Sequence, residues 1–305
     1  MDIGATTVRF AHYQQSDYLY SRCDSLGLII WAEIPFVNRV SGQEAENARC
    51  QLRELIRQSF NHPSIYVWGL HNEVYHPHEY TKELTRSLHD LAKTEDPDRY
   101  TVSVNGYGHM EHPVNLNADI QGMNRYFGWY EKKLQDIEPW VEGLEKNYPD
   151  QKLMLTEYGA DANITPLANR GDLPARNMKG MVTFDRKTKK DSYFWYKANW
   201  SEDPVSNLTQ RRNVDREKKV TSITVYSNIG EPKVFLNGQE LSGIRKGYTD
   251  VHYIIDNVTL ADGKNIVKTV ASKDGKTYED TIEWMYTGEK KREADSFSIK
   301  GVHAG

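Results

Sequence analysis

The stretch from Ser64 to Tyr75, SIYVWGLHNEVY, decides the fold expected for this chain. It is an apolar run of strand character, and it ends directly in Asn72 and Glu73. A carboxylate at the carboxyl end of a buried strand lies where β/α barrels carry their chemistry. Glu73 is therefore the first candidate for a functional side chain.

A second run of the same design lies further along the chain. Residues Lys152 to Asp161, KLMLTEYGAD, read as a strand that ends in Glu157. Two glutamates at strand ends are the side chains that a glycosidase requires. An isolated glutamate at a strand end is more often solvated or salt-bridged, so the prediction depends on the pair and on its flanking residues.

The first 200 residues alternate short apolar runs with helical patterns, which predicts β/α units and a parallel sheet. The predicted strands are 4–10, 28–33, the run from 64, 100–105, 119–124 and 153–156. The predicted helices are 16–26, 43–60, 79–93, 129–146 and 189–200. The fold class is α/β, an incomplete (β/α)₈ TIM barrel with about six of the eight strands. Between Glu157 and Lys189 the only further candidate strand is Val182-Thr183-Phe184, and 164–179 reads as loop.

From Thr221 the composition changes to short alternating strands separated by turn signals. Asn237-Gly238 and Asp274-Gly275 are typical of tight hairpins. This spacing predicts a small β-sandwich of immunoglobulin-like type. The expected domains are a partial barrel at 1–200, a linker at 201–220, the sandwich at 221–288 and a tail at 289–305.

Composition excludes several classes of function. The chain has 305 residues, 38% of them hydrophobic, and a formal charge of −4 with both signs interspersed. No nucleic-acid partner and no membrane association are predicted, and the start of the chain lacks the layout of a signal peptide. Localisation stays open. Cys23 and Cys50 are expected to be unpaired thiols on helices. The irregularly spaced His62, His76, His78, His109 and His112 are expected to lie on the surface rather than to bind a metal.

Five separated motifs resemble glycoside hydrolase family 2, which includes β-galactosidases, β-glucuronidases and β-mannosidases. They follow the family's order and resemble its catalytic barrel and the start of the next domain. The motifs are VRFAHYQQSDYLYSRCDSLGLIIWAEIPF, WGLHNE, MNRYFGWY, LTEYGAD and MVTFDRKTKKDSYFWYKANW.

The resemblance implies a role for each matching residue. Glu73 would be the general acid and base, and Glu157 the nucleophile of a retaining mechanism, with carboxyl groups roughly 5 to 5.5 Å apart. Tyr126 would donate a hydrogen bond to the nucleophile. Asn72 would bind the 2-hydroxyl of the sugar. The further substrate-binding residues implied are His12, Glu33, His71, Asn124, Asn177 and Lys179.

The resemblance leaves the sugar undecided. Asn177 and Lys179 form an Asn-x-Lys-Gly run like one that β-glucuronidases use to hold a carboxylate, but similar runs occur in galactosidase-like members. A magnesium-ligand motif found in some relatives is not visible after Glu33, where Ile34-Pro35-Phe36 follows, so neither a metal nor a cofactor is predicted.

The resemblance implies a retaining exo-β-glycosidase, most like a β-galactosidase, whose partner is a carbohydrate substrate. β-Glucuronidase specificity is one alternative. Because full-length relatives carry further domains before the barrel, another is a shortened, non-catalytic remnant whose sandwich binds carbohydrate or a partner. Strands supplied by a partner chain and association of identical chains also stay open.

Overall fold

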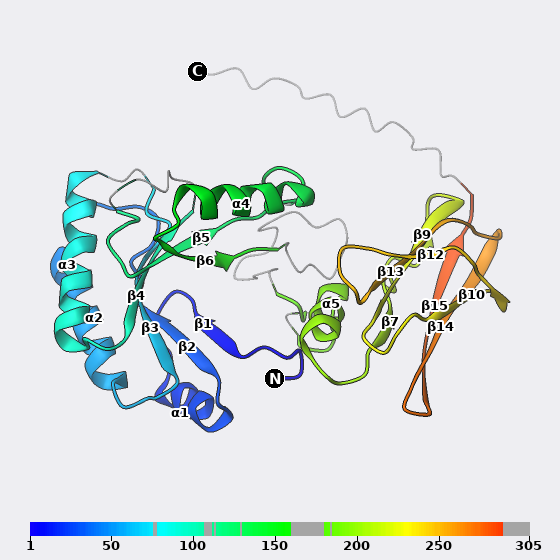
Figure 1. The fold of residues 1–305 in the computed structure, drawn as a ribbon, viewed down its shortest axis with the longest axis horizontal. Helices are drawn as coiled ribbons and strands as arrows, with labels where there is room; N and C mark the ends of the chain where they lie inside the picture. The colour runs from blue at the N-terminus through cyan, green and yellow to red at the C-terminus, as the bar shows by residue number, and fades with distance from the viewer. Residues whose placement is uncertain are drawn as a thin grey trace, which may run out of the picture. The chain divides into compact units, whose positions relative to one another are not determined.

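The structure is a computed structural model that describes residues 1–75, 78–106, 112, 114–128, 130–159, 180–183 and 185–288. The chain divides into two compact units (Figure 1). One runs from Thr6 to Asp161, and the other combines Met1–Ala5 with the chain from Ala162 onward. The predictions for Asn177, Lys179, Phe184 and the tail at 289–305 concern residues outside the described ranges.

The first unit is an open parallel sheet of six strands in sequential order, covered by helices, which confirms the expected incomplete barrel. The strands are β1 Thr7–Phe10, β2 Ile29–Glu33, β3 Ile65–Asn72, β4 Tyr100–Asn105, β5 Ile120–Asn124 and β6 Lys152–Glu157. The helices are α1 Asp17–Leu26, α2 Ala45–Ser59, α3 Glu79–Glu95 and α4 Ile137–Asn147, which follows a 3₁₀ turn at Leu134–Asp136. Because the sheet is parallel, the carboxyl ends of all its strands meet at one edge.

The pleat of the strands places a core on each face of this sheet. Ile30 and Ala32 of β2 belong to the cluster that packs against α1, α2 and α3. Trp31, between them, lies in a second cluster with Val67 and Val102 on the other face. Strands buried on both faces need near-continuous apolar sequence, and this explains why β2 and β3 can be recognised in the sequence.

The second unit contains α5 and two largely antiparallel sheets. Its elements are α5 Asp191–Trp200, β7 Ser206–Leu208, β8 Asp215–Arg216, β9 Val220–Ser227, β10 Lys233–Leu236, β11 Gln239–Glu240, β12 Ile244–Lys246, β13 His252–Thr259, β14 Gly263–Lys273 and β15 Lys276–Tyr286. The sheet orders are β11-β10-β14-β15-β8 and β12-β13-β9-β7. Buried residues of both sheets, among them Ile223 and Trp284, form one hydrophobic cluster.

Both predicted hairpins are confirmed. Asn237 and Gly238 have φ of 51° and 87°, and they connect β10 to β11. Asp274 and Gly275 have φ of 52° and 74°, and they connect β14 to β15. Two successive positive φ values match the twist of the flanking strands, which is why Asn-Gly and Asp-Gly pairs are favoured there.

Three sequence predictions differ from the structure. The helix predicted from Trp129 begins at Ile137, because Pro139 is tolerated only in a first turn. The predicted linker at 201–220 contains β7 and β8, which pair with β9 and β15. Val182 forms an isolated bridge with Lys189 and no strand of the barrel.

The structure also groups α5 with the second unit, whereas the sequence placed the domain boundary after residue 200. Cys23 and Cys50 are free, as predicted. In the described ranges, no helix combines the length and the apolar character needed to span a membrane.

We expect Gly69→Ala to destabilise the first unit. Gly69 pairs with Glu33 across β2 and β3, and a Cβ atom there would overlap Glu33 Cβ and Trp31 Nε1. Relieving that overlap must move packed atoms, so the free energy of unfolding should fall by about 1–3 kcal/mol. Urea denaturation measures the change.

The matched control is Gly143→Ala in α4, where a Cβ meets nothing within 4 Å. There alanine should stabilise the protein by about 0.5–1 kcal/mol because it restricts the unfolded chain. Equal stability of Gly69→Ala and the wild type would contradict the close approach of β2 and β3.

Candidate active site

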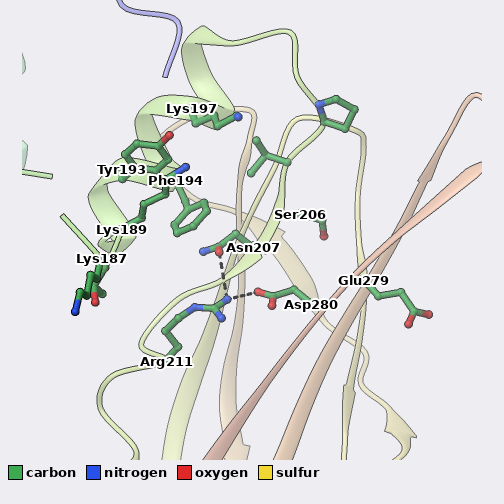
Figure 2. Close-up of a pocket in the computed structure, with 13 residues that line it drawn as sticks. Lys187, Lys189, Tyr193, Phe194, Lys197, Ser206, Asn207, Arg211, Glu279 and Asp280 are labelled. Carbon is green, nitrogen blue, oxygen red and sulfur yellow. Dashed lines mark hydrogen bonds and ion pairs between the residues drawn. The ribbon is translucent and has the colours of Figure 1, made fainter. Parts of the chain in front are cut away.

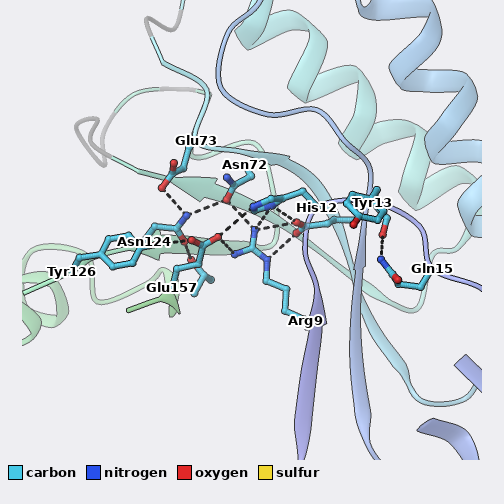
Figure 3. A network of polar contacts seen from close by, with 11 residues as sticks. Arg9, His12, Tyr13, Gln15, Asn72, Glu73, Asn124, Tyr126 and Glu157 are labelled. Atoms are coloured by element: carbon cyan, nitrogen blue, oxygen red, sulfur yellow. Dashed lines mark hydrogen bonds and ion pairs between the residues drawn. The ribbon is translucent and has the colours of Figure 1, made fainter. Parts of the chain in front are cut away.

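The two candidate glutamates lie at the same edge of the parallel sheet (Figure 3). Glu73 directly follows β3 and has a left-handed φ of 48°. Glu157 is the last residue of β6. A positive φ on a residue other than glycine is uncommon, and such strain is typical of functional positions.

Each oxygen of Glu73 accepts a hydrogen bond. Asn124 Nδ2 donates to Oε1 at 2.8 Å, and the Tyr75 hydroxyl donates to Oε2 at 2.7 Å. Gly106 lies directly beneath this side chain, where a Cβ atom would come within 2.7 Å of Glu73 Cγ. Glycine at 106 therefore makes room for the carboxyl group.

Glu157 also has a donor on each oxygen. Arg9 Nη1 donates to Oε1 at 2.8 Å, and the Tyr126 hydroxyl donates to Oε2. Both oxygens therefore face donors, and one donor carries a full positive charge, so the orientation of the carboxyl group is fixed. A carboxyl group held in this way can be directed at an electrophilic carbon.

Tyr126 connects the surroundings of the two glutamates. Its side chain is buried, and burial together with the hydrogen bond to Glu157 raises its pKa. The charges of both Glu157 and Glu73 contribute to that rise. The phenol therefore stays protonated as a donor, and both carboxyl groups lie close enough to act on it.

Arg9 is the centre of the network, and the sequence analysis did not predict it. Its guanidinium binds both oxygens of Glu33, with Nε at 3.0 Å from Oε2 and Nη2 at 3.1 Å from Oε1. Nη2 also donates to Asn72 Oδ1 at 2.9 Å, and the group stacks 4.1 Å from the centre of the Trp31 ring. An arginine within the apolar strand TVRF was the signal that could have found it, because a buried charge requires partners.

Four of the predicted substrate-binding residues lie in this network. His12 Nδ1 is 2.7 Å from Glu33 Oε1, and the other ring nitrogen is 3.8 Å from Glu157 Oε1. Asn124 Nδ2 also donates to Asn72 Oδ1 at 3.1 Å, and Asn124 Oδ1 accepts from Thr156 at 2.7 Å. These contacts join His12, Glu33, Asn72 and Asn124 to both glutamates.

His71 lies apart from the network. Its ring is buried against Phe36, and Nε2 lies 3.1 Å from the Val114 carbonyl oxygen. Burial lowers its pKa to about 4, so the ring is neutral and donates to that carbonyl. Among the described residues, the ring contacts Phe36 and Val114 and not the two glutamates. In the described part of the chain, no group of three or more His, Cys, Asp or Glu side chains could hold a metal ion.

A cavity of about 560 Å³ lies in the second unit (Figure 2). Its basic lining residues are largely paired with acids: Lys197 with Asp203, and Arg211 with Asp280. Tyr193 and Phe194 contribute aromatic surface. The acidic lining residues Glu279 and Asp280 are neighbours on β15, so their side chains point to opposite faces of the strand. The carboxyl edge of the first unit is therefore the stronger candidate for chemistry.

Known proteins resemble this chain in sequence and in structure. A family model described as "Glycosyl hydrolases family 2, TIM barrel domain" matches residues 1–168. A solved Bacteroides fragilis structure, whose name describes it provisionally as a β-galactosidase, is 70% identical, with a TM-score of 0.92 over 97% of this chain and 52% of its own.

Two curated relatives carry different names. A Bacteroides fragilis β-glucuronidase is 31% identical over 93% of this chain and 49% of its own length. A Thermoanaerobacterium thermosulfurigenes β-galactosidase is 33% identical over 50% of this chain and 20% of its own length. The chain therefore spans about half the length of the first of these relatives, and less of the second.

Proposed function

The chain belongs to glycoside hydrolase family 2, and from that membership we propose that it is a retaining exo-β-glycosidase that releases terminal β-linked sugars through a covalent glycosyl-enzyme. One observation carries the proposal. Glu73 and Glu157 are joined by a single hydrogen-bonded network that runs through Asn124, Asn72 and Arg9. Two carboxyl groups that share one site are the requirement of this reaction.

In the first step Glu157 attacks the anomeric carbon while the bond to the leaving oxygen breaks. The electron pair of that bond goes to the leaving oxygen, which takes a proton from Glu73. Arg9 and Tyr126 hold Glu157 for attack through its two oxygens. Because Asn72 Oδ1 is occupied by Arg9 and Asn124, Asn72 would contact the sugar 2-hydroxyl through Nδ2.

In the second step water replaces the enzyme at the anomeric carbon. Glu73, now a carboxylate, accepts a proton from water as its oxygen attacks, and Glu157 leaves with the electron pair of the ester bond. His12, 36% exposed beside Glu33, is placed to contact a sugar hydroxyl. Two inversions at one carbon retain the β configuration.

We assign this chemistry to the partial barrel within residues 1–200. The second unit is proposed to contain an immunoglobulin-like sandwich at 221–288, extended by β7 and β8. The common hydrophobic cluster of its two sheets and its hairpin connections support that assignment. No cofactor is required by the proposed steps.

A β-galactoside is the proposed substrate, because the 70% identical relative carries that name. A β-glucuronide is the alternative, favoured by the name of the Bacteroides fragilis relative that covers 93% of this chain and by the run at Asn177 and Lys179. The two sugars differ at C5, where the glucuronide carries a carboxylate, so a cationic side chain such as Lys179 would discriminate between them.

The experiment is hydrolysis of p-nitrophenyl β-galactoside and β-glucuronide by the purified chain. We expect turnover of the galactoside, with the β-anomer as first product by proton NMR. Faster turnover of the glucuronide would select the alternative sugar. A first product of α configuration would contradict the retaining mechanism, and turnover of neither substrate would reject activity of this chain on both proposed sugars.

The second candidate function is carbohydrate binding without turnover, and the cavity beside Tyr193 and Phe194 favours it. Aromatic rings and charged side chains are the groups that bind sugars in other proteins. Titration of the chain with galactose and glucuronate, followed by amide chemical shifts, would test it. Shift changes confined to the lining of this cavity, in a protein without turnover, would support binding alone.

A further inference from the structure

The two oxygens of Glu73 face donors of different kinds. Oε1 faces the amide nitrogen of Asn124 at 2.8 Å (Figure 3). Oε2 faces the hydroxyl of Tyr75 at 2.7 Å. An amide NH₂ group can only donate a hydrogen bond. A hydroxyl group can donate or accept, because its hydrogen rotates.

The orientation of the Asn124 amide follows from Arg9. A guanidinium has no acceptor, so the Asn72 atom at 2.9 Å from Arg9 Nη2 must be the carbonyl oxygen Oδ1. That oxygen accepts, and the Asn124 atom at 3.1 Å from it must therefore be the nitrogen Nδ2. The same nitrogen faces Glu73 Oε1, which must accept as well.

A proton on Glu73 Oε1 therefore cannot point at Asn124 Nδ2, because that nitrogen is itself a donor. A proton on Oε1 would meet the NH₂ group of Asn124, whereas the Tyr75 hydroxyl beside Oε2 can accept a hydrogen bond as well as donate one. We propose that Tyr75 is a positioning residue for Glu73, and that Oε2 is the atom that gives the proton to the leaving group and takes it back from water. This inference rests on the proposed glycosidase function.

The backbone around Tyr75 is tied to the ends of two strands. Tyr75 N–H donates to the Asn38 carbonyl at 3.0 Å, and Asn38 N–H donates to the Asn72 carbonyl at 3.1 Å. Asn72 N–H in turn donates to the Phe36 carbonyl at 2.9 Å. The segment after β2 thus continues the pairing with β3 and holds Tyr75 beside Glu73.

This geometry gives Tyr75 a defined part in each half of the reaction. When Oε2 releases its proton to the leaving oxygen, the new negative charge accepts the Tyr75 hydroxyl hydrogen. When water attacks, its proton returns to Oε2, and the Tyr75 hydroxyl can remain beside the protonated oxygen because it can accept as well as donate. Stabilising the charged form makes Glu73 a better acid, which matters most for leaving groups that need protonation.

The test is Tyr75→Phe in the full chain, assayed on a methyl and a 2,4-dinitrophenyl β-glycoside of whichever sugar the wild type cleaves. Loss of one hydrogen bond to a charged group should lower kcat/KM on the methyl glycoside about ten- to a hundredfold. The dinitrophenyl glycoside, whose leaving group needs no proton, should change by less than about threefold in kcat/KM. The alkaline limb of the pH profile should move to higher pH by about one unit, because the charged form of Glu73 has lost a donor.

The matched control is Tyr66→Phe, which makes the same change near the opposite end of β3, where Tyr66 is 40% exposed. It should leave both rates and the pH profile unchanged. Replacement of Tyr75 by 3-fluorotyrosine, a stronger donor, should move the alkaline limb the other way. Equal losses on both substrates, or an unmoved alkaline limb, would overturn the proposal.

A second measurement separates this inference from the proposed function. Carbon-13 NMR titration of the Glu73 carboxyl group, assigned with Glu73→Gln, reports its protonation without any turnover. A midpoint that rises in Tyr75→Phe supports the hydrogen bond even in a chain that hydrolyses nothing. An unchanged midpoint in a folded variant, with the near-ultraviolet circular dichroism of the wild type, rejects the role of Tyr75.

Discussion

Glu157→Gln is expected to lower kcat/KM for an aryl β-glycoside on the order of 10⁴-fold or more. Glutamine keeps the shape of the side chain but cannot form the ester to the anomeric carbon, so the two-step route is lost. The Arg9 and Tyr126 donors that hold the carboxylate would then face an amide. Steady-state kinetics on p-nitrophenyl glycosides measures the loss.

Glu73→Gln should cost less, on the order of 10² to 10⁴ in kcat/KM. Its loss should also depend on the leaving group, and it should nearly disappear in the first step for a dinitrophenyl glycoside. Sodium azide separates the two roles. With Glu73→Ala, azide should attack the glycosyl-enzyme and give the β-glycosyl azide, whereas with Glu157→Ala it should replace the nucleophile and give the α-glycosyl azide.

Glu79→Gln is the control for these variants. Glu79 begins α3 and pairs with Lys82, where its side chain is 71% exposed. Its rate should equal that of the wild type. Turnover that survives either Glu73→Gln on a poor leaving group or Glu157→Gln would contradict the assigned roles, and identical azide products from both alanine variants would do the same.

The strands that carry the site could be predicted because their sequence changes abruptly at their ends. Apolar runs stop at Glu33, Asn72 and Glu157, and the structure ends β2, β3 and β6 at these residues. β2 and β3 are buried on both faces, whereas β6 is half-buried. The change from apolar to polar residues is local, so it can be recognised in one sequence without knowledge of the fold. The same reasoning explains the two confirmed hairpins, where Asn-Gly and Asp-Gly meet a local need for positive φ.

The contacts that Arg9 and Tyr75 make could not be predicted, because they depend on residues elsewhere in the chain. Arg9 meets Glu157 across 148 positions of sequence, and nothing in TVRF specifies that contact. Tyr75 is only two residues from Glu73, but its hydroxyl faces Oε2 because Asn38 holds its backbone. His71 shows the converse, since its position beside Asn72 predicted a substrate ligand while its ring packs on Phe36.

The short strands were missed for a different reason. β8 and β11 have two residues each, and alternation cannot be recognised over so short a run. β7 was read as linker because Ser206 and Asn207 are polar, yet Asn207 is buried, with Nδ2 bonded to the Leu208 carbonyl at 3.1 Å. A short strand whose polar side chain hydrogen-bonds a backbone carbonyl cannot be distinguished from a loop in the sequence.

Arg9→Met is expected to damage both stability and catalysis. Arg9 is 12% exposed and binds Glu33, which is 2% exposed, through two parallel hydrogen bonds. Removing one partner of a buried ion pair leaves an uncompensated charge, so the free energy of unfolding should fall by about 3–5 kcal/mol. The loss of donors to Glu157 and Asn72 should lower kcat by about 10² to 10³. Urea denaturation and steady-state kinetics measure the two effects.

The double variant Arg9→Met with Glu33→Gln separates these effects. Removing the buried negative charge as well should restore most of the stability, because neither charge then remains without a partner. It should not restore activity, since Glu157 Oε1 and Asn72 Oδ1 still lack their donor. Arg57→Met is the control. Arg57 pairs with Glu95 but is 66% exposed, so its loss should cost no more than about 1 kcal/mol. If activity returned together with stability in the double variant, Arg9 would act only by supporting the fold around Glu33. If it does not return, the guanidinium itself holds the nucleophile, and β1 contributes to the active site as directly as β3 and β6.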